Sequence, residues 1–137
     1  MGSGKLTVKV VNGRGLQNKD TFSKSDPYCM VELGGKSFST KHMSDNLDPD
    51  WNEQFEFDVS QGEDVLALSV WDKNKISKDV FMGYSFVSFD NCKKDQPTTK
   101  VCSFVLLDLT LLRRHFFLHR NLLFPFFVTL IIASMFS

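Results

Sequence analysis

Short runs in which apolar and polar residues alternate are the feature that most constrains how this chain folds. In the first run, residues 6–10, the side chains of Leu6, Val8 and Val10 fall on one face. A period of two residues is typical of a β-strand with one buried face, whereas a helix repeats about every 3.6 residues. Similar runs occupy residues 27–33, 37–41, 55–59, 66–70, 81–89 and 101–107. The sequence therefore predicts about seven short strands.

Polar loops separate these runs, and helical periodicity is almost absent before residue 109. A chain of 137 residues that is 42% hydrophobic and 23% charged is typical of one globular domain. We predict an all-β fold, an antiparallel β-sandwich of eight strands or of seven strands with a substitute at one edge. The sandwich is expected at residues 1–109, followed by a basic and then apolar tail at 110–137.

The formal net charge is zero, with sixteen basic and sixteen acidic residues, but the charges are unevenly placed. All the acidic residues precede residue 110, whereas Arg113, Arg114 and Arg120 follow it. A chain without an overall basic charge is not expected to bind nucleic acid. Three cysteines without a CxxC pair argue against a disulfide framework or zinc site, and no apolar leader opens the chain. A cytoplasmic location is expected.

Two loops are dense in oxygen-bearing side chains. Asp20 and Asp26 lie in the first of them, and Asp72, Asn74, Ser77 and Asp79 lie in or beside the other. Ca²⁺ prefers six to eight oxygen ligands, many of them carboxylates, and a cation relieves the repulsion between clustered acids. The alternative is that these are solvated turn residues, because Asp and Asn favour turns through local hydrogen bonds.

The same loops carry apolar and basic residues. Phe22 and Ile76 are expected at exposed tips, flanked by Lys19, Lys24, Lys73, Lys75 and Lys78. Apolar tips can enter the membrane interface, and lysines attract anionic headgroups. In the alternative interpretation, Phe22 folds back onto the core and the lysines serve solubility.

The tail has three interpretations. Residues 121–137 are uncharged and apolar, slightly short of the roughly 20 residues of a membrane span, and contain Pro125. They could anchor the protein in a membrane, pack on the sheet edge, or be a non-functional terminus. No alternating strand is predicted after residue 107, so one sheet edge is expected to be open. Such an edge could be covered by the tail or could pair with a second copy of the chain.

No set of residues suggests catalysis. The histidines are His42, His115 and His119, and neither a nucleophile with its base nor a phosphate-binding loop is visible. We therefore expect a binding protein rather than an enzyme.

Four segments resemble the C2 domain family. They read KLTVKVVNGRGL, KDTFSKSDPYCMVEL, LDPDWNEQFEF and LALSVWDKNKISKDVFMG, and the resemblance spans about residues 5–109. It implies an eight-stranded antiparallel sandwich that docks to phospholipid through three loops at one end, often with calcium between protein aspartates and lipid phosphate.

The resemblance also implies ligand positions. Asp20, Asp26 and Asp72 match family aspartates, and Ser77 matches a serine that serves an extra calcium. The next family aspartate is Asn74 here. The last falls on Val80, with Asp79 one residue early, so one weakened calcium site is expected.

From these observations we predict a calcium-modulated module that binds anionic phospholipid on the cytosolic face of membranes. The alternative is a calcium-independent protein-interaction module built on the same sandwich.

Overall fold

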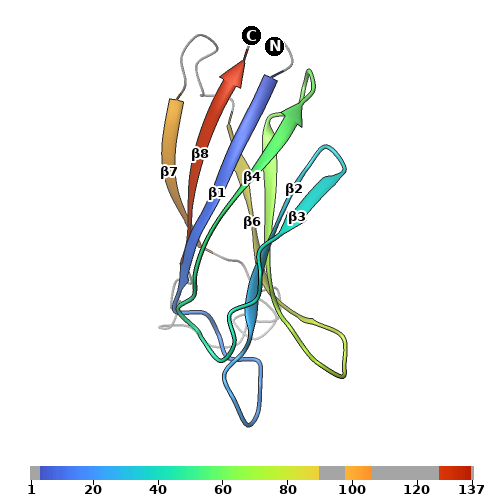
Figure 1. Cartoon of the computed structure of the whole chain (residues 1–137), viewed down its shortest axis with the longest axis vertical. Helices are drawn as coiled ribbons and strands as arrows, with labels where there is room; N and C mark the ends of the chain where they lie inside the picture. The colour runs from blue at the N-terminus through green and yellow to red at the C-terminus, as the bar shows by residue number, and fades with distance from the viewer. Residues whose placement is uncertain (1–3, 90–97, 106–126, 137) are drawn as a thin grey trace, which may run out of the picture.

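The protein is a sandwich of two four-stranded antiparallel sheets, described by a computed structural model for residues 4–89, 98–105 and 127–136 (Figure 1). One sheet has the order β4-β1-β8-β7 and the other has the order β3-β2-β5-β6. The strands are β1 (Gly4–Arg14), β2 (Pro27–Leu33), β3 (Lys36–Ser39), β4 (Asp50–Val59), β5 (Val65–Asp72), β6 (Val80–Ser88), β7 (Thr98–Val105) and β8 (Phe127–Phe136). The described residues contain no helix, in agreement with the predicted all-β class.

The core lies between the two sheets and is made by the alternating residues. Leu6, Val8 and Val10 of β1 are buried there, as are Val31 of β2 and the inward residues of β5. The side chains that are almost fully buried include Phe57, Leu66, Leu68, Val70, Val128, Leu130 and Ile132. Each contributes roughly 1.5–3 kcal/mol to stability by leaving water. Because side chains alternate between the two faces of a strand, the period of two residues fixes which face turns toward this core.

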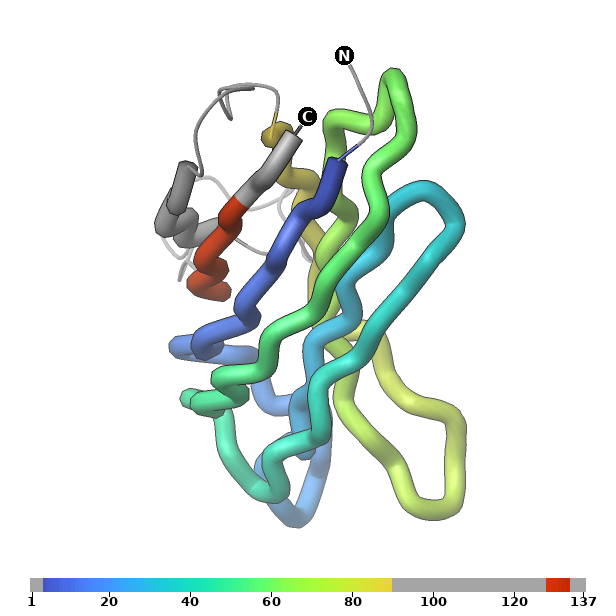
Figure 2. The backbone as a smooth tube through the Cα atoms, turned by 45° about the horizontal axis from the view of Figure 1, so that its top comes forward, coloured from blue at the N-terminus to red at the C-terminus, as the bar shows by residue number. Residues whose placement is uncertain are grey.

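The last strand corrects the sequence-based expectation. β8 pairs antiparallel with β1 from Gly4↔Phe136 to Arg14↔Phe127, and its other side pairs with β7. The sequence predicts no alternating strand after residue 107, but one of its interpretations has the tail pack against the sheet. β8 does so between β1 and β7, inside the sheet rather than on its edge. Figure 2 shows this C-terminal strand in red beside the blue N-terminal strand. The boundary at residue 109 therefore leaves a sandwich strand outside the predicted domain.

β8 does not show the alternation in its sequence because apolar residues occupy most positions on both of its faces. Its buried residues Val128, Leu130 and Ile132 are interleaved with Thr129, Ile131 and Ala133, which are only partly covered. An apolar run of this kind cannot be assigned to strand or helix by periodicity alone. The interpretation of residues 121–137 as a membrane-spanning helix differs from this strand. Residues 110–126, with the three arginines and Pro125, lie outside the described residues.

A search of the described residues for helices of membrane-spanning length and hydropathy finds none.

Three loops gather at the end of the sandwich opposite the two termini (Figure 1). The first loop, residues 15–26, joins β1 to β2, the second, residues 40–49, joins β3 to β4, and the third, residues 73–79, joins β5 to β6. Antiparallel strands place these connections together, although they are far apart in sequence. Most residues predicted to bind calcium or lipid lie here.

Candidate cation and membrane-docking loops

A cavity of about 500 Å³ lies between the three loops. Two carboxylates of the first loop and one of the second face it, together with polar and basic residues of the third. Its lining is Asp20, Ser23, Asp26, Ser44, Asp45, Lys73, Asn74, Lys75, Ile76 and Ser77. The structure thus brings Asp20, Asp26, Asn74 and Ser77 to one place, as the sequence predicted.

Asp72 is the buried acid of this end. It is the last residue of β5, and its side chain has no exposed surface. Oδ1 accepts a hydrogen bond from the Asp26 backbone N–H at 2.7 Å, whereas Oδ2 is buried without a partner. Burial raises the pKa of Asp72. The Asp26 N–H and the nearby Ser25 hydroxyl oppose this shift, and the negative charges of Asp20 and Asp26 add to it. An unpartnered buried carboxylate oxygen is costly, so this position favours a cation or a proton.

The first loop is braced by its own polar residues. The Oδ1 atom of Asn18 accepts hydrogen bonds from the backbone N–H of Asp20 at 3.1 Å and of Ser25 at 3.0 Å. Asp20 Oδ2 in turn accepts a bond from the Ser23 hydroxyl at 3.1 Å. Asp26 Oδ1 accepts the backbone N–H of Asp45 at 2.7 Å. These bonds hold two acidic residues of the loop near Asp72 without neutralising their charge.

Asp79 does not join this group. Its Oδ2 accepts a hydrogen bond from the Tyr28 hydroxyl at 2.7 Å and lies 3.6 Å from Lys73 Nζ. Its Oδ1 accepts the Asn74 backbone N–H at 3.0 Å. The Tyr28 bond is the main reason that the pKa of Asp79 is lowered, followed by the Asn74 bond. Burial, and then Asp79, raise the pKa of Tyr28 to about 12.

The position of Asp79 follows from strand parity. Asp72 pairs with Val80 across β5 and β6, and paired residues lie on the same face of a sheet. Asp79 comes one residue earlier, so its side chain is directed to the other face, where Tyr28 lies. A shift of one residue in a strand reverses the face that a side chain occupies. The carboxylate predicted at this end is present, but on the wrong side for the cavity.

No three His, Cys, Asp or Glu side chains among the described residues are placed to hold a metal ion as they stand. The donor set fits a cation in part. Asp20, Asp26 and Asp72 interact electrostatically, and the buried oxygen of Asp72 lacks a partner. The Asn74 side-chain amide donates a hydrogen bond to the Lys78 carbonyl at 2.9 Å, so the Asn74 side-chain oxygen is the atom that a cation would contact. Calcium binding would therefore require some of these side chains to change their rotamers.

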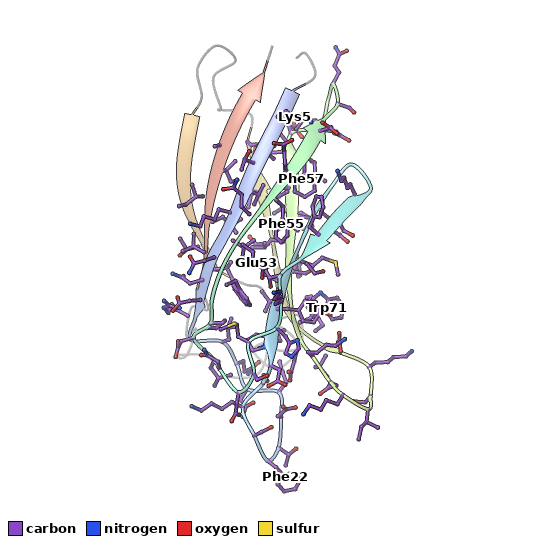
Figure 3. The ribbon with its side chains drawn as sticks, viewed as in Figure 1. Lys5, Phe22, Glu53, Phe55, Phe57 and Trp71 are labelled. Atoms are coloured by element: carbon purple, nitrogen blue, oxygen red, sulfur yellow. The ribbon has the colours of Figure 1, made fainter. Side chains whose placement is uncertain are left out.

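Phe22 and Ile76 are fully exposed, at relative accessibilities of 101% each. Figure 3 shows Phe22 at the extreme tip of the first loop. Phe22 therefore does not fold back onto the core, and Ile76 borders the acidic cavity. Two large apolar side chains in water at one end of a protein are unfavourable unless another surface covers them.

The lysines predicted around these tips differ in their surroundings. Lys73 is paired with Asp79, and the Lys19 ammonium donates to Gln17 Oε1 at 2.7 Å. Lys24, Lys75 and Lys78 are exposed. A second cavity of about 470 Å³ lies beside Lys73 and is lined by Tyr28, Ser39, Thr40, Lys41, His42 and Lys73. Basic side chains therefore surround the acidic cavity.

Comparison with known proteins establishes the family. The model of the family described as C2 domain matches residues 4–104, which is more than half of the chain. The chain belongs to the C2 domain family. This confirms the resemblance found in the sequence.

The chain spans only part of the length of the curated relatives that it matches. It is 36% identical to intersectin-1 of Xenopus laevis over 104 residues, which are 72% of this chain and 6% of that protein. It is 41% identical to Protein C2-DOMAIN ABA-RELATED 11 of Arabidopsis thaliana over 85 residues, 62% of this chain and 51% of that protein. A solved structure of a C2 domain from plant extended synaptotagmin 1 is 25% identical, with a TM-score of 0.78, and the match covers 98% of this chain and 95% of that one.

Asp45 is the residue of this C2 domain that sequence reasoning missed. It lines the acidic cavity from the second loop, and it adopts a φ of 58° in the left-handed region. Asp tolerates this region better than most residues do. The segment Ser44-Asp45-Asn46 was the available signal, since Asp and Asn mark turns. Nothing in the sequence indicated that this turn meets the first loop.

Proposed function

We propose that this C2 domain docks to anionic phospholipid surfaces on the cytosolic face of membranes through its first and third loops, and that calcium strengthens the docking. The observation that carries the proposal is the full exposure of Phe22 and Ile76 at the end of the sandwich that also holds the acidic cavity. One end thus offers apolar tips, basic side chains and a carboxylate that lacks a partner.

Each part of this end has a physical role in docking. Burying a large apolar side chain is worth roughly 1.5–3 kcal/mol, so two tips supply a useful share of membrane affinity. Lysines near an anionic surface add about 1 kcal/mol each, and Lys24, Lys75 and Lys78 are exposed beside the tips. The neighbouring cavity with Lys41 and His42 extends this basic surface.

The acidic residues oppose the approach of an anionic membrane, and a bound cation would offset their charge. Asp20, Asp26 and Asp72 would hold it, with Asn74 and Ser77 as neutral oxygen donors. Bound calcium supplies positive charge between these carboxylates and a lipid phosphate. With three carboxylates and no acid at positions 74 and 80, we expect one site of modest affinity.

A second candidate function, calcium-independent protein interaction, is favoured by the outer face of the β5–β6 pair. Trp71, Phe81, Tyr84 and Phe86 form a chain of ring contacts there, with centroid distances of 5.3, 6.1 and 5.6 Å. Phe86 is 64% exposed. Aromatic residues on an exposed surface are typical of interfaces.

Vesicle co-sedimentation distinguishes the two functions. We expect the protein to sediment with vesicles of phosphatidylcholine and phosphatidylserine in millimolar calcium, less with the same vesicles in EDTA, and little with phosphatidylcholine alone. Equal binding in calcium and EDTA would remove calcium from the proposal. No binding to either vesicle would favour the protein-interaction function.

A further inference from the structure

The second loop is fastened to the first loop through Asp45. Asp45 Oδ1 accepts a hydrogen bond from the backbone N–H of Lys24 at 2.6 Å, and the backbone N–H of Asp45 donates to Asp26 Oδ1 at 2.7 Å. The next residue, Asn46, donates its backbone N–H to the Ser25 carbonyl at 3.1 Å. The side of the first loop that follows Phe22 is therefore held from outside the loop.

These bonds form a continuous path from β5 to the tip of the first loop. Asp72 Oδ1 accepts the N–H of Asp26, Asp26 Oδ1 accepts the N–H of Asp45, and Asp45 Oδ1 accepts the N–H of Lys24. Each bond joins a carboxylate to a backbone amide, a stronger pairing than one between neutral groups. Lys24 lies only two residues after Phe22.

Asp45 itself contributes nothing to the core. Its side chain is exposed, and its backbone occupies the left-handed region at φ 58°. Holding a non-glycine residue in this region costs on the order of 1 kcal/mol, so the conformation persists only where the surroundings require it. Here the required conformation is the one that directs its N–H at Asp26 and its carboxylate at Lys24.

We propose that Asp45 is a positioning residue for membrane docking, holding the Phe22 tip in place through the Lys24 amide. Through Asp26, Asp45 also links this tip to the acidic residue Asp72. The inference rests on the proposed docking function but adds a residue of the second loop to it. Asp45 acts by accepting a hydrogen bond, so its charge is not what the role requires.

Two substitutions separate the hydrogen bond from the charge. Asp45→Asn keeps an oxygen that can accept the Lys24 N–H and tolerates a positive φ, whereas Asp45→Gly keeps the backbone freedom and removes the acceptor. We expect Asp45→Gly to weaken binding to phosphatidylcholine–phosphatidylserine vesicles in calcium by about tenfold, which corresponds to the loss of one hydrogen bond. Asp45→Asn should stay within about twofold of the wild type.

Two further measurements separate positioning from general destabilisation. Hydrogen exchange of the Lys24 amide should accelerate in Asp45→Gly and remain slow in Asp45→Asn. In a Phe22→Ala background, Asp45→Gly should cost little additional vesicle binding, because the tip that it positions is gone. Full chains with matched melting temperatures are compared throughout.

The outcomes are decisive in each direction. Loss of binding in Asp45→Gly with rescue in Asp45→Asn supports the positioning role. Equal loss in both variants overturns it and makes the Asp45 charge the important property. If the wild type binds vesicles and Asp45→Gly binds them equally well, the positioning role is wrong but the docking function stands. Absence of wild-type binding overturns the positioning role together with the docking function.

Discussion

The two ends of the sandwich treat charge in opposite ways. At the end that carries the termini, Lys5 of β1 forms ion pairs with Glu56 and Asp58 of β4. These pairs raise the pKa of Lys5 and lower that of Asp58, so each group stabilises the charged form of the other. At the loop end, Asp72 is buried with one oxygen unpartnered; burial raises its pKa, and its acidic neighbours raise it further.

The same antiparallel strands therefore support two different arrangements of charge, balanced at one end and unbalanced at the other. Charges directly across an antiparallel pair satisfy one another and need no ligand. The acids of the loop end repel one another, and the apolar tips Phe22 and Ile76 lie in water beside them. The loop end therefore carries unbalanced negative charge and exposed apolar side chains, whereas the charges of the opposite end balance one another.

The largest expected effect comes from removing the apolar tips of the loop end. Replacing both Phe22 and Ile76 with Ala should reduce vesicle affinity about a hundredfold, because each side chain loses part of the roughly 1.5–3 kcal/mol of its burial in the membrane. Melting temperature should be unchanged, since both side chains are exposed. Phe86→Ala, on the outer face of β6, is the matched control and should leave vesicle binding intact. Equal losses from Phe86→Ala and the tip variant would contradict the docking surface.

The second prediction concerns the acidic pair Asp20 and Asp72. Asp20→Asn combined with Asp72→Asn should abolish the increase in stability that calcium gives, which for a ligand at a hundred times its Kd is about 2.7 kcal/mol. Thermal unfolding with calcium or EDTA measures this. The control is Asp58→Asn at the opposite end, which should retain the full increase. A wild-type protein insensitive to millimolar calcium would show that the loop end is satisfied without a cation.

The third prediction sharpens the comparison through strand parity. Val80→Asp places a carboxylate on the face of Asp72 and should tighten calcium binding about tenfold. Asp79→Asn should change calcium affinity less than about twofold, because Asp79 bonds Tyr28 and Lys73 instead. Calorimetric titration of both variants measures the two constants. The parity argument is wrong if Asp79→Asn weakens calcium binding and Val80→Asp does not strengthen it.

The smallest expected effect concerns Asp72 alone. Without calcium, Asp72→Asn should stabilise the protein by about 1 kcal/mol at neutral pH by removing a buried, repelled charge. A pKa raised in the folded state means that the wild type gains stability as pH falls and loses it as pH rises through that pKa. The advantage of the variant should therefore shrink toward the usual Asp pKa near 4. Denaturant unfolding of both proteins at neutral pH and near pH 4 measures this difference. A difference in unfolding free energy that stays the same at both pH values would contradict the prediction.

Much of the fold could be predicted because strands with one buried face display it in their sequence. The alternation in β1 and β5 indicated both the strands and their inward residues. β8 could not be assigned in this way, since a strand with apolar residues on both faces resembles a membrane segment. Its place between β1 and β7 is decided by pairing between residues distant in sequence.

The grouping of the candidate residues was predictable to the extent that their loops follow strands ending at the same side of the sandwich. Asp20, Asp26 and Asp72 meet at one end because antiparallel strands return there. Asp79 was misplaced because its direction depends on the register between β5 and β6, which fixes Asp72 opposite Val80. Asp45 was missed because its importance arises from contact between two loops, which no local pattern in either loop expresses.

The pairing of Gly4 with Phe136 has a consequence for how the chain folds. The ribosome makes β1 long before its neighbour β8. The sheet with the order β4-β1-β8-β7 therefore cannot be completed until every other strand of the sandwich has been synthesised. Contacts between such distant residues carry a large loop-closure entropy and slow folding. During that interval β1 and β7 present unpaired backbone edges, which other nascent chains can bind. We therefore expect refolding to be slow, with yields that fall as protein concentration rises.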